Sequence, residues 1–221
     1  MTSQAGLAGV DGCKAGWVVI WDETPLRIEI VSTFSEVASI TASCAVVAVD
    51  MPIGLPSTAA RGGRPCDAAA RRVLRGRAAS VFSAPPRHVL DASSYQEALE
   101  RCRLDGVGLS IQAFHLVPKI RQIDAALAGN AGRFFEAHPE LAFLQLSGSV
   151  LPSKHSKEGL DLRRTLLSEE FAIPPTPQGA KTDDMLDALV LVHTARRIHA
   201  NAAVKLGGDP DETGLEMAIW Y

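Results

Sequence analysis

The apolar run just before residue 50 restricts the folds open to this chain more than any other feature of its sequence. Residues 45–49 read Ala-Val-Val-Ala-Val, and Asp50 follows them directly. A half-exposed strand alternates apolar and polar residues, whereas a strand covered by helices on both faces is apolar throughout. The run therefore predicts a central strand over residues 45–50 and, with it, an α/β fold.

The residues upstream predict the rest of a mixed sheet. Residues 7–11 and 17–21 are apolar and flank a glycine-containing turn, and residues 26–31 alternate apolar and polar side chains. A short helix is expected over residues 34–40. Three strands, a helix and a buried strand together indicate an α/β fold with a mixed sheet.

The remainder of the chain shows mainly helical patterns. Ser94 and Glu97 match the S-x-x-E capping box that begins a helix, which should end near Arg103. Pro118 should kink or split the helical pattern over residues 110–127. The other predicted elements are helices near residues 160–169 and 183–200 and strands near residues 134–137 and 215–220.

Basic residues are concentrated in one stretch. Residues 61–87 contain seven arginines and one acid, although the formal net charge of the whole chain is −3. Arginines bind phosphates and release counterions, which favours nucleic-acid binding, but a solvated helix face would show the same composition. We expect one domain over residues 1–221 with a helical, arginine-rich insertion at about 56–130. The candidate nucleic-acid-binding residues are Arg64, Arg71, Arg72, Arg75, Arg77, Lys154 and Lys157.

Length and composition exclude several classes of protein. The chain has 221 residues, of which 47% are hydrophobic, enough to form a sizeable core. No apolar run approaches the roughly 18 residues of a membrane-spanning helix. The first residues lack the basic and apolar regions of a signal peptide. The four cysteines form no C-x-x-C pair, which disfavours a zinc site or a disulfide framework. A cytoplasmic protein with no membrane partner is therefore expected.

Two carboxylates occupy unusual positions at the ends of apolar strands. Asp11 follows the first apolar run, and Asp50 follows the central one. An unpaired buried carboxylate costs free energy, so each needs a cation, hydrogen-bond donors or an exposed strand end. Either residue alone could simply cap the turn that follows it. Their occurrence at two strand ends favours a shared site.

The predicted helix over residues 183–200 supplies further acids. Asp183 and Asp184 suit the positive end of the helix dipole, but Asp187 lies one turn further on among apolar residues. Asp184 and Asp187 are three residues apart and therefore share a helix face. Clustered buried carboxylates repel one another, and a divalent ion relieves the repulsion. Oxygen ligands favour Mg²⁺ or Mn²⁺ over zinc, and such ions can support phosphodiester hydrolysis.

Several motifs, taken in order along the chain, resemble a known family. They are Gly9–Trp17 (GVDGCKAGW), Val49–Leu55 (VDMPIGL), Arg64–Asp67 (RPCD), Ser80–Phe82 (SVF), Gln112–Phe114 (QAF), His138–Glu140 (HPE) and Asp183-Asp184. Together they resemble the domain family of unknown function numbered 429, which is regarded as a family of predicted RNase H-like nucleases. Asp184–Leu189 (DMLDAL) is also similar to the last-helix motif of RuvC-type Holliday-junction resolvases.

The resemblance implies an RNase H-like fold, in which a mixed five-stranded sheet is flanked by helices and a helical insertion follows the fourth strand. It implies that Asp11 and Asp50 are metal ligands on the first and fourth strands, completed by Asp184 or Asp187 from the helix. Resolvases of this type often carry Glu where this chain has Asp50, so the spacing or number of metal ions could differ. Glu140 is either an additional catalytic ligand or a solvated turn carboxylate.

Three functions remain open from the sequence. The first is Mg²⁺- or Mn²⁺-dependent hydrolysis of DNA or RNA, with Asp11 bridging two ions. A homodimer would be expected for a junction substrate, because two strands must be reached. The second is nucleotide binding, as in the related actin-like ATPase fold, where a similar G-V-D-G turn contacts phosphates. The third is a non-catalytic nucleic-acid or protein binding module whose carboxylates are structural.

Overall fold

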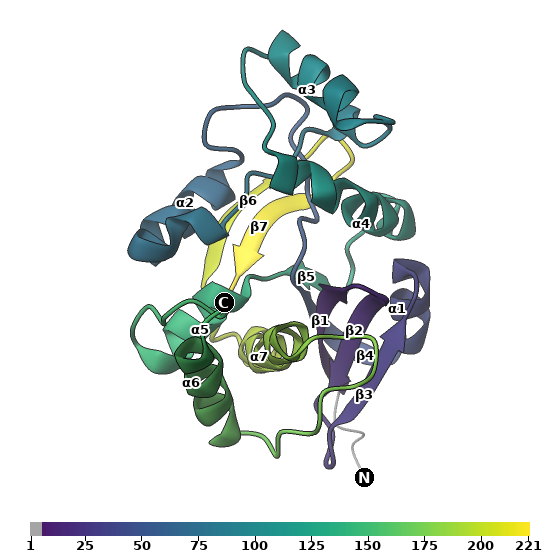
Figure 1. The fold of residues 1–221 in the computed structure, drawn as a ribbon. Helices are drawn as coiled ribbons and strands as arrows, with labels where there is room; N and C mark the ends of the chain where they lie inside the picture. Colours follow the sequence, from purple (N-terminus) through teal and green to yellow (C-terminus); the bar gives the residue numbers. More distant parts are fainter. Residues whose placement is uncertain (1–5) are drawn as a thin grey trace. The chain divides into compact units, whose positions relative to one another are not determined.

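The computed structural model describes residues 6–221 (Figure 1). Residues 1–5, the start of the stretch in which no signal peptide is expected, lie outside the described residues. The described part of the chain forms two compact units. Unit 1 contains the residues up to 51 together with 133–204 and 220–221. Unit 2 contains residues 52–132 and 205–219, so it combines the arginine-rich region with a segment from much later in the sequence.

Unit 1 is built on a mixed sheet. Within the described residues its five strands are β1 (Gly6–Cys13), β2 (Gly16–Trp21), β3 (Arg27–Val31), β4 (Cys44–Val49) and β5 (Phe134–Glu136). Their order in the sheet is β3-β2-β1-β4-β5. β1 pairs antiparallel with β2 and parallel with β4, β2 pairs antiparallel with β3, and β4 pairs parallel with β5. This arrangement confirms the predicted α/β fold with a mixed five-stranded sheet.

The central position predicted for residues 45–50 is confirmed. β4 lies between β1 and β5, and the side chains of Val47, Ala48 and Val49 are fully buried. Helix α1 (Phe34–Ile40) covers one face of the sheet, where the ring of Phe34 contacts those of Trp17 and Phe134. Helix α7 (Thr182–His199) lies on the other face (Figure 1). An apolar strand without alternation is what this double covering requires.

Helix α7 packs directly against the backbone of β1. Its residues 188–192 are fully buried, as their apolar sequence predicts. A Cβ atom added at Gly9 in β1 would lie only 2.1 Å from the carbonyl oxygen of Ala188. Glycine is therefore needed at this position, because any side chain would push the helix away from the strand. The contact fixes α7 beside the part of β1 that carries Asp11.

Two further helices in unit 1 are α5 (Pro139–Ser147) and α6 (Lys157–Ser168). α5 is not among the predicted helices, although its start carries two recognisable signals. Pro139 occupies the first turn, and the side chain of His138 accepts a hydrogen bond from the backbone N–H of Glu140. α6 begins before the predicted residue 160, because the hydroxyl of Ser156 caps it by accepting from the N–H of Gly159.

Unit 2 is mainly helical. Its helices are α2 (Pro65–Leu74), the 3₁₀ helices η1 (Arg75–Ser80) and η2 (Arg87–Val89), α3 (Tyr95–Leu104) and α4 (Ile111–Leu127). The expected capping residue Ser94 accepts a hydrogen bond from the N–H of Glu97 and begins α3. Pro118 does not split α4, because the burial of Val117 and Ile120 offsets the one backbone hydrogen bond that proline removes. Across residues 6–221, no helix is both long and apolar enough to cross a membrane.

The later segment of unit 2 contributes a small sheet. Its two strands are β6 (Lys205–Pro210) and β7 (Glu216–Trp220), which pair with each other. The predicted strand near residues 215–220 is therefore present, but its partner β6 is not predicted. Gly207, Gly208 and Pro210 are residues that normally weaken or end a strand, so the sequence of β6 gives no strand signal.

Candidate metal centre

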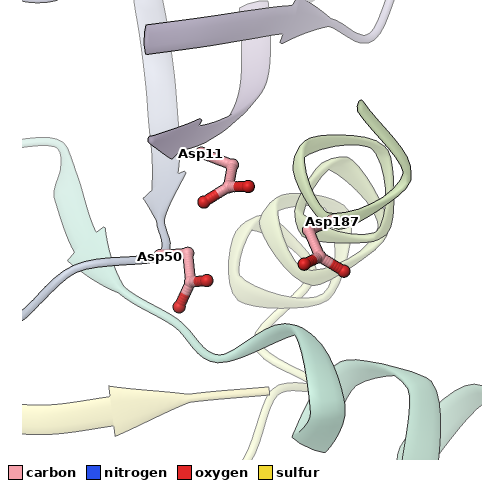
Figure 2. A group of neighbouring side chains, drawn as sticks. All are labelled: Asp11, Asp50 and Asp187. Atoms are coloured by element: carbon pink, nitrogen blue, oxygen red, sulfur yellow. The ribbon is translucent and has the colours of Figure 1, made fainter. Parts of the chain in front are cut away.

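Three aspartates that the sequence singles out come together in unit 1. Asp11 lies in β1, Asp50 directly follows β4, and Asp187 lies in the second turn of α7. Figure 2 shows the helix residue facing the two residues from the sheet. One carboxylate oxygen of each aspartate lies within 4.8 Å of those of the other two. This is the group among residues 6–221 whose side chains could hold a metal ion. We refer to Asp11, Asp50 and Asp187 as the acidic centre.

The sheet places Asp11 and Asp50 side by side. β1 and β4 are parallel neighbours, and the backbone N–H of Asp50 donates to the carbonyl oxygen of Val10 at 2.9 Å. Asp11 is 7% exposed, and its Oδ1 accepts a hydrogen bond from the N–H of Gly12 at 2.7 Å. Asp11 thus stabilises the turn that follows it and also faces Asp50. The sequence allows Asp11 either to cap the turn that follows it or to belong to a shared site, and in the structure it does both.

Asp187, which α7 supplies, is the most deeply buried member of the acidic centre. The residue is 1% exposed, and its Oδ2 forms an ion pair with Nζ of Lys154. Its Oδ1 is buried and has no hydrogen-bond partner among the described residues. An unpaired buried carboxylate oxygen costs free energy, because it has lost its water without gaining a donor. This oxygen is therefore available to a ligand that faces the acidic centre.

The carboxylates of the acidic centre hold their protons more tightly than ordinary aspartates do. Burial raises the pKa of Asp50 and that of Asp187 to about 6, and the positive charge of Lys154 limits both shifts. Burial also raises the pKa of Asp11 well above its ordinary value, and the charges of Asp50 and Asp187 add to the rise. The shifts express the free-energy cost of burying several negative charges close together. A cation among the carboxylates would remove that cost.

The residues of the acidic centre fit a divalent metal ion. The candidate ligand atoms are all carboxylate oxygens, which suit Mg²⁺ and Mn²⁺ better than softer metals. They approach from β1, from the end of β4 and from α7, so they could surround an ion from different sides (Figure 2). Oδ1 of Asp187 is the one oxygen of that residue that Lys154 leaves without a partner among the described residues.

Asp184, the other helix acid, lies outside the acidic centre. Its Oδ2 accepts a hydrogen bond from the backbone N–H of Lys181 at 2.9 Å, so it caps the start of α7. Burial raises the pKa of Asp184. Its charge adds to the effect of burial on the pKa of Asp11, which indicates that the two carboxylates feel each other. Of the two helix acids expected at the site, Asp187 is the one that joins the strand aspartates.

Glu140 forms a buried ion pair within unit 1. It is 7% exposed, and both its oxygens accept hydrogen bonds from Nη2 of Arg163, at 2.7 and 2.9 Å. The expectation of a solvated turn carboxylate is therefore wrong. The helix that begins at Pro139 turns the Glu140 side chain inward, towards α6. Glu140 lies outside the acidic centre, although its charge adds to the effect of burial on the pKa of Asp50.

Comparison with models of known protein families finds a match over most of the chain. Residues 9–212 match the family model DUF429, described as a protein of unknown function. The chain belongs to the DUF429 family. This match confirms the family predicted from the sequence motifs, and no curated protein gives a significant match.

Two solved structures resemble this DUF429 chain. One is Thermus thermophilus RuvC in complex with Holliday junction substrate, with 12% identity, a TM-score of 0.36, and coverage of 90% of this chain and 98% of that chain. The other is a structure of Thermus thermophilus RuvC, with 14% identity, a TM-score of 0.36, and coverage of 89% of this chain and 97% of that chain.

Lys154 contacts the acidic centre of this DUF429 protein, although its sequence context predicts a different role. The sequence suggests that it belongs to a basic, nucleic-acid-binding cluster, whereas the structure pairs its Nζ with Oδ2 of Asp187. Its side chain is 29% exposed, so it is partly enclosed. The two residues are 33 positions apart, and Lys154 lies in a loop, so no periodicity in the sequence connects them.

Two of the predicted phosphate-binding arginines instead have partners inside unit 2. Arg64 is 1% exposed and donates to Oδ1 of Asp67 through Nε and Nη2, and to the carbonyl oxygen of Gly54 through Nη1. Arg71 donates to the carbonyl oxygen of Val81 at 2.9 Å and to the hydroxyl of Ser83 at 2.8 Å. Arg64 is thus buried rather than exposed for phosphate binding, because the nearby acid draws its guanidinium into the interior.

The other predicted basic residues differ in exposure. Arg72 and Arg75 in unit 2 and Lys157 in unit 1 are exposed, whereas Arg77 is half-buried in η1. Exposed guanidinium and ammonium groups can reach phosphates in solution without losing an internal partner. Within the predicted set, Arg72, Arg75 and Lys157 therefore remain the candidates best suited to contact a polyanion.

Proposed function

We propose that this protein is a metal-dependent nuclease that hydrolyses phosphodiester bonds in DNA or RNA. The observation that carries the proposal is the acidic centre: the buried Asp11 in β1, the half-buried Asp50 at the end of β4 and the buried Asp187 in α7 have carboxylate oxygens within 4.8 Å of one another. A purely structural set of this kind would be expected to have donors for its oxygens, whereas Oδ1 of Asp187 has none among the described residues. A divalent ion is the ligand that satisfies these oxygens and neutralises their charge.

Each member of the acidic centre would have a definite task. Asp11, Asp50 and Asp187 would hold Mg²⁺ or Mn²⁺ at the end of the sheet. The ion, when bound, supplies Lewis-acid stabilisation of the phosphodiester oxygens and a water of lowered pKa. The partly buried setting strengthens electrostatic interactions, because water screens them less there than at the surface. The backbone contact at Gly9 keeps α7, and with it Asp187, at a fixed distance from β1.

The exposed basic residues would supply affinity for the nucleic acid. Arg72, Arg75 and Lys157 are exposed, and neutralising phosphates with such side chains gives binding that does not depend on base sequence. A two-fold homodimer is the expected assembly if the substrate is a symmetric junction, because it would place one centre on each strand. All four cysteines are unpaired in the structure, which fits our proposal of a cytoplasmic location.

The first test is a calorimetric titration with Mn²⁺ of the wild-type protein and the Asp11→Asn variant, with circular dichroism to establish that both are folded. We expect the wild type to bind Mn²⁺ and the variant to lose binding by a large factor, because it lacks one ligand of the ion. If folded wild type binds no Mn²⁺, even with an oligonucleotide present to complete the coordination, the proposal is refuted and a non-catalytic binding module is favoured.

The second test is a cleavage screen with labelled duplex, single-stranded and branched DNA and RNA in the presence of Mn²⁺. We expect cleavage by the wild type, and none by Asp11→Asn or in the presence of a chelator. Cleavage retained by Asp11→Asn would point to a contaminating nuclease or to another site. An increase in melting temperature with ATP and Mg²⁺, but not with Mg²⁺ alone, would favour the nucleotide-binding alternative instead.

A further inference from the structure

Lys154 stands out because it is the basic side chain that pairs with a member of the acidic centre. It lies in the loop between α5 and α6, and its Nζ forms an ion pair with Oδ2 of Asp187. The remaining oxygen of that carboxylate, Oδ1, is the one without a partner among the described residues. One carboxylate thus offers one oxygen to an ammonium group and keeps the other for a second positive charge.

The loop that carries Lys154 is held in place by buried contacts. Arg163 in α6 is fully buried and donates through Nη1 to the carbonyl oxygens of Pro152 and Gly159, at 2.8 and 2.9 Å. Through Nη2 it binds both oxygens of Glu140 in α5. The Glu140–Arg163 pair therefore fixes the backbone two residues before Lys154. Because its backbone is anchored, Lys154 loses less conformational entropy on pairing than a lysine on a mobile loop would.

The close packing of α6 against the same loop adds a second constraint. A Cβ atom added at Gly159 would lie 2.1 Å from the carbonyl oxygen of Ser153, so glycine is required for this approach. The hydroxyl of Ser156 also accepts from the N–H of Gly159 and donates to the carbonyl oxygen of Ser153. These contacts define the path of the chain on both sides of Lys154. Its position at the acidic centre is thus built into the fold of the loop.

The charge of Lys154 acts on the whole acidic centre. Burial lowers the pKa of Lys154, but attraction to Asp187, Asp50 and Asp11 outweighs burial and leaves the pKa raised. A lysine ammonium is ordinarily charged at neutral pH, and the ion pair with Asp187 favours that charged form. With the metal bound, three ionised carboxylates would carry −3, and one ammonium with one divalent ion would carry +3, so this set would be neutral. A second divalent ion would leave an excess of +2 in a partly buried site, which is costly.

We infer that Lys154 takes the place of a second metal ion, so that the acidic centre binds one divalent cation instead of the two expected by resemblance. The inference rests on the proposed function, since it concerns the same metal site. It also gives Glu140 and Arg163 a role: they position the loop that brings Lys154 to Asp187. Lys154 thus differs from the exposed lysine Lys157, which we propose contacts nucleic acid.

The inference is tested by counting Mn²⁺ ions with the metal alone, at neutral pH, by calorimetry and electron paramagnetic resonance. Wild type should bind one Mn²⁺ per chain. Lys154→Gln should bind two, with the spin–spin coupling of a close pair of ions, because removal of the ammonium makes room for a second cation. Lys154→Arg keeps the positive charge and should bind one. Lys157→Gln, which removes an exposed lysine nearby, is the matched control and should also bind one.

Several results would overturn the inference. Two coupled ions in the wild type would show that Lys154 does not occupy a cation position, while leaving the proposed nuclease intact. One ion in Lys154→Gln, bound more tightly than in wild type, would show that Lys154 merely competes with the metal. A wild-type count of two would overturn the inference even if Lys154→Gln does not fold, and Lys154→Arg then remains as the second variant. Failure of folded wild type to bind Mn²⁺ at all would refute the proposed function itself, together with the inference.

Discussion

Each unit of the molecule buries acidic side chains, and the two groups differ in how their oxygens are satisfied. In unit 2, Asp67 is 1% exposed, and its oxygens accept hydrogen bonds from the side chain and backbone of Arg64 and from the N–H of Ala84. In unit 1, Asp187 is equally buried, but one of its oxygens has no partner among the described residues. The first group is complete without any ligand, whereas the second requires one. Buried charge alone therefore does not identify a functional site. A buried carboxylate oxygen that has no hydrogen-bond partner is the more informative sign.

The largest effect on stability is expected from removing the guanidinium that completes the group in unit 2. Arg64→Ala would leave the buried Asp67 carboxylate without its cation, which should lower the free energy of unfolding by about 3–5 kcal/mol. Urea denaturation measures this loss. Arg72→Ala, which removes an exposed arginine from α2, the helix that follows Arg64, is the control and should change stability by less than about 0.5 kcal/mol. If both substitutions lower the free energy of unfolding equally, the buried ion pair of Arg64 does not stabilise the protein more than an exposed arginine does.

A second substitution tests how unit 1 holds its acidic centre together. Gly9→Ala would place a Cβ atom against the backbone of Ala188, and relieving the overlap should cost about 1–3 kcal/mol of stability. The shift of α7 should also weaken Mn²⁺ binding, because Asp187 moves away from Asp11. Gly108→Ala is the matched control, since a Cβ at Gly108 meets nothing within 4 Å. Unchanged Mn²⁺ affinity in a destabilised Gly9→Ala would show that the helix contact does not set the site.

A third test uses the dependence of stability on pH. The pKa values of Asp50 and Asp187 are about 6 in the folded protein, above the ordinary value of 3.8. A raised pKa means that the folded state binds protons more tightly than the unfolded state, so this contribution is full below pH 4 and is lost as pH rises through 6. The metal-free protein should therefore become less stable between pH 4 and pH 8, by roughly 1–3 kcal/mol from these groups.

Asp50→Asn sharpens the same test. At pH 8 without metal, the variant should be more stable than wild type, because it no longer ionises a buried carboxylate, and at pH 4 the two should be similar. Added Mn²⁺ should reverse the order at pH 8 by stabilising wild type more than the variant. Thermal unfolding at the two pH values, with and without Mn²⁺, gives the four comparisons. If Asp50→Asn is less stable than wild type in metal-free buffer at pH 8, the ionised carboxylates of the acidic centre do not destabilise the metal-free protein, contrary to our expectation.

The smallest effect concerns the exposed arginines. Arg72→Ala and Arg75→Ala should leave stability almost unchanged but weaken nucleic-acid binding. If each contacts one phosphate of a duplex, the slope of log K against log salt concentration should become shallower by about 0.9 for each substitution. Fluorescence anisotropy with a labelled duplex at several salt concentrations measures the slope. A slope that both substitutions leave unchanged would exclude these residues from the interface.

The sequence predicts those parts of the fold and site whose cause is local. The run that ends at Asp50 and the apolar turns around Asp187 specify a buried strand and a buried helix by themselves, so the two acids stand out without a structure. The buried state of Arg64 could also have been found, because Arg64, Pro65 and Asp67 match the start of a helix with an acid at its third position. The arginine-rich composition of the surrounding stretch points to phosphate binding instead.

The parts that could not be predicted depend on residues far apart in the sequence. Glu140 is buried because Arg163 reaches it from another helix, 23 positions away. Lys154 approaches Asp187 only once α5, α6 and α7 are packed together. Neither contact leaves a periodic trace, because each joins single residues on different elements. β6 escapes prediction for a different reason: its partner β7 follows closely in the sequence, but the glycines and the proline of β6 give no strand signal of their own.

The backbone contact at Gly9 has a consequence for the order of events in biosynthesis. Strand β1 leaves the ribosome early, but the helix that closes over it, and that carries Asp187, is synthesised much later. A nascent chain that ends before Thr182 has Asp11 and Asp50 but lacks the third acid. On the proposed function, a partly translated chain therefore lacks one ligand of the metal ion, and metal-dependent cleavage cannot begin before α7 has been synthesised.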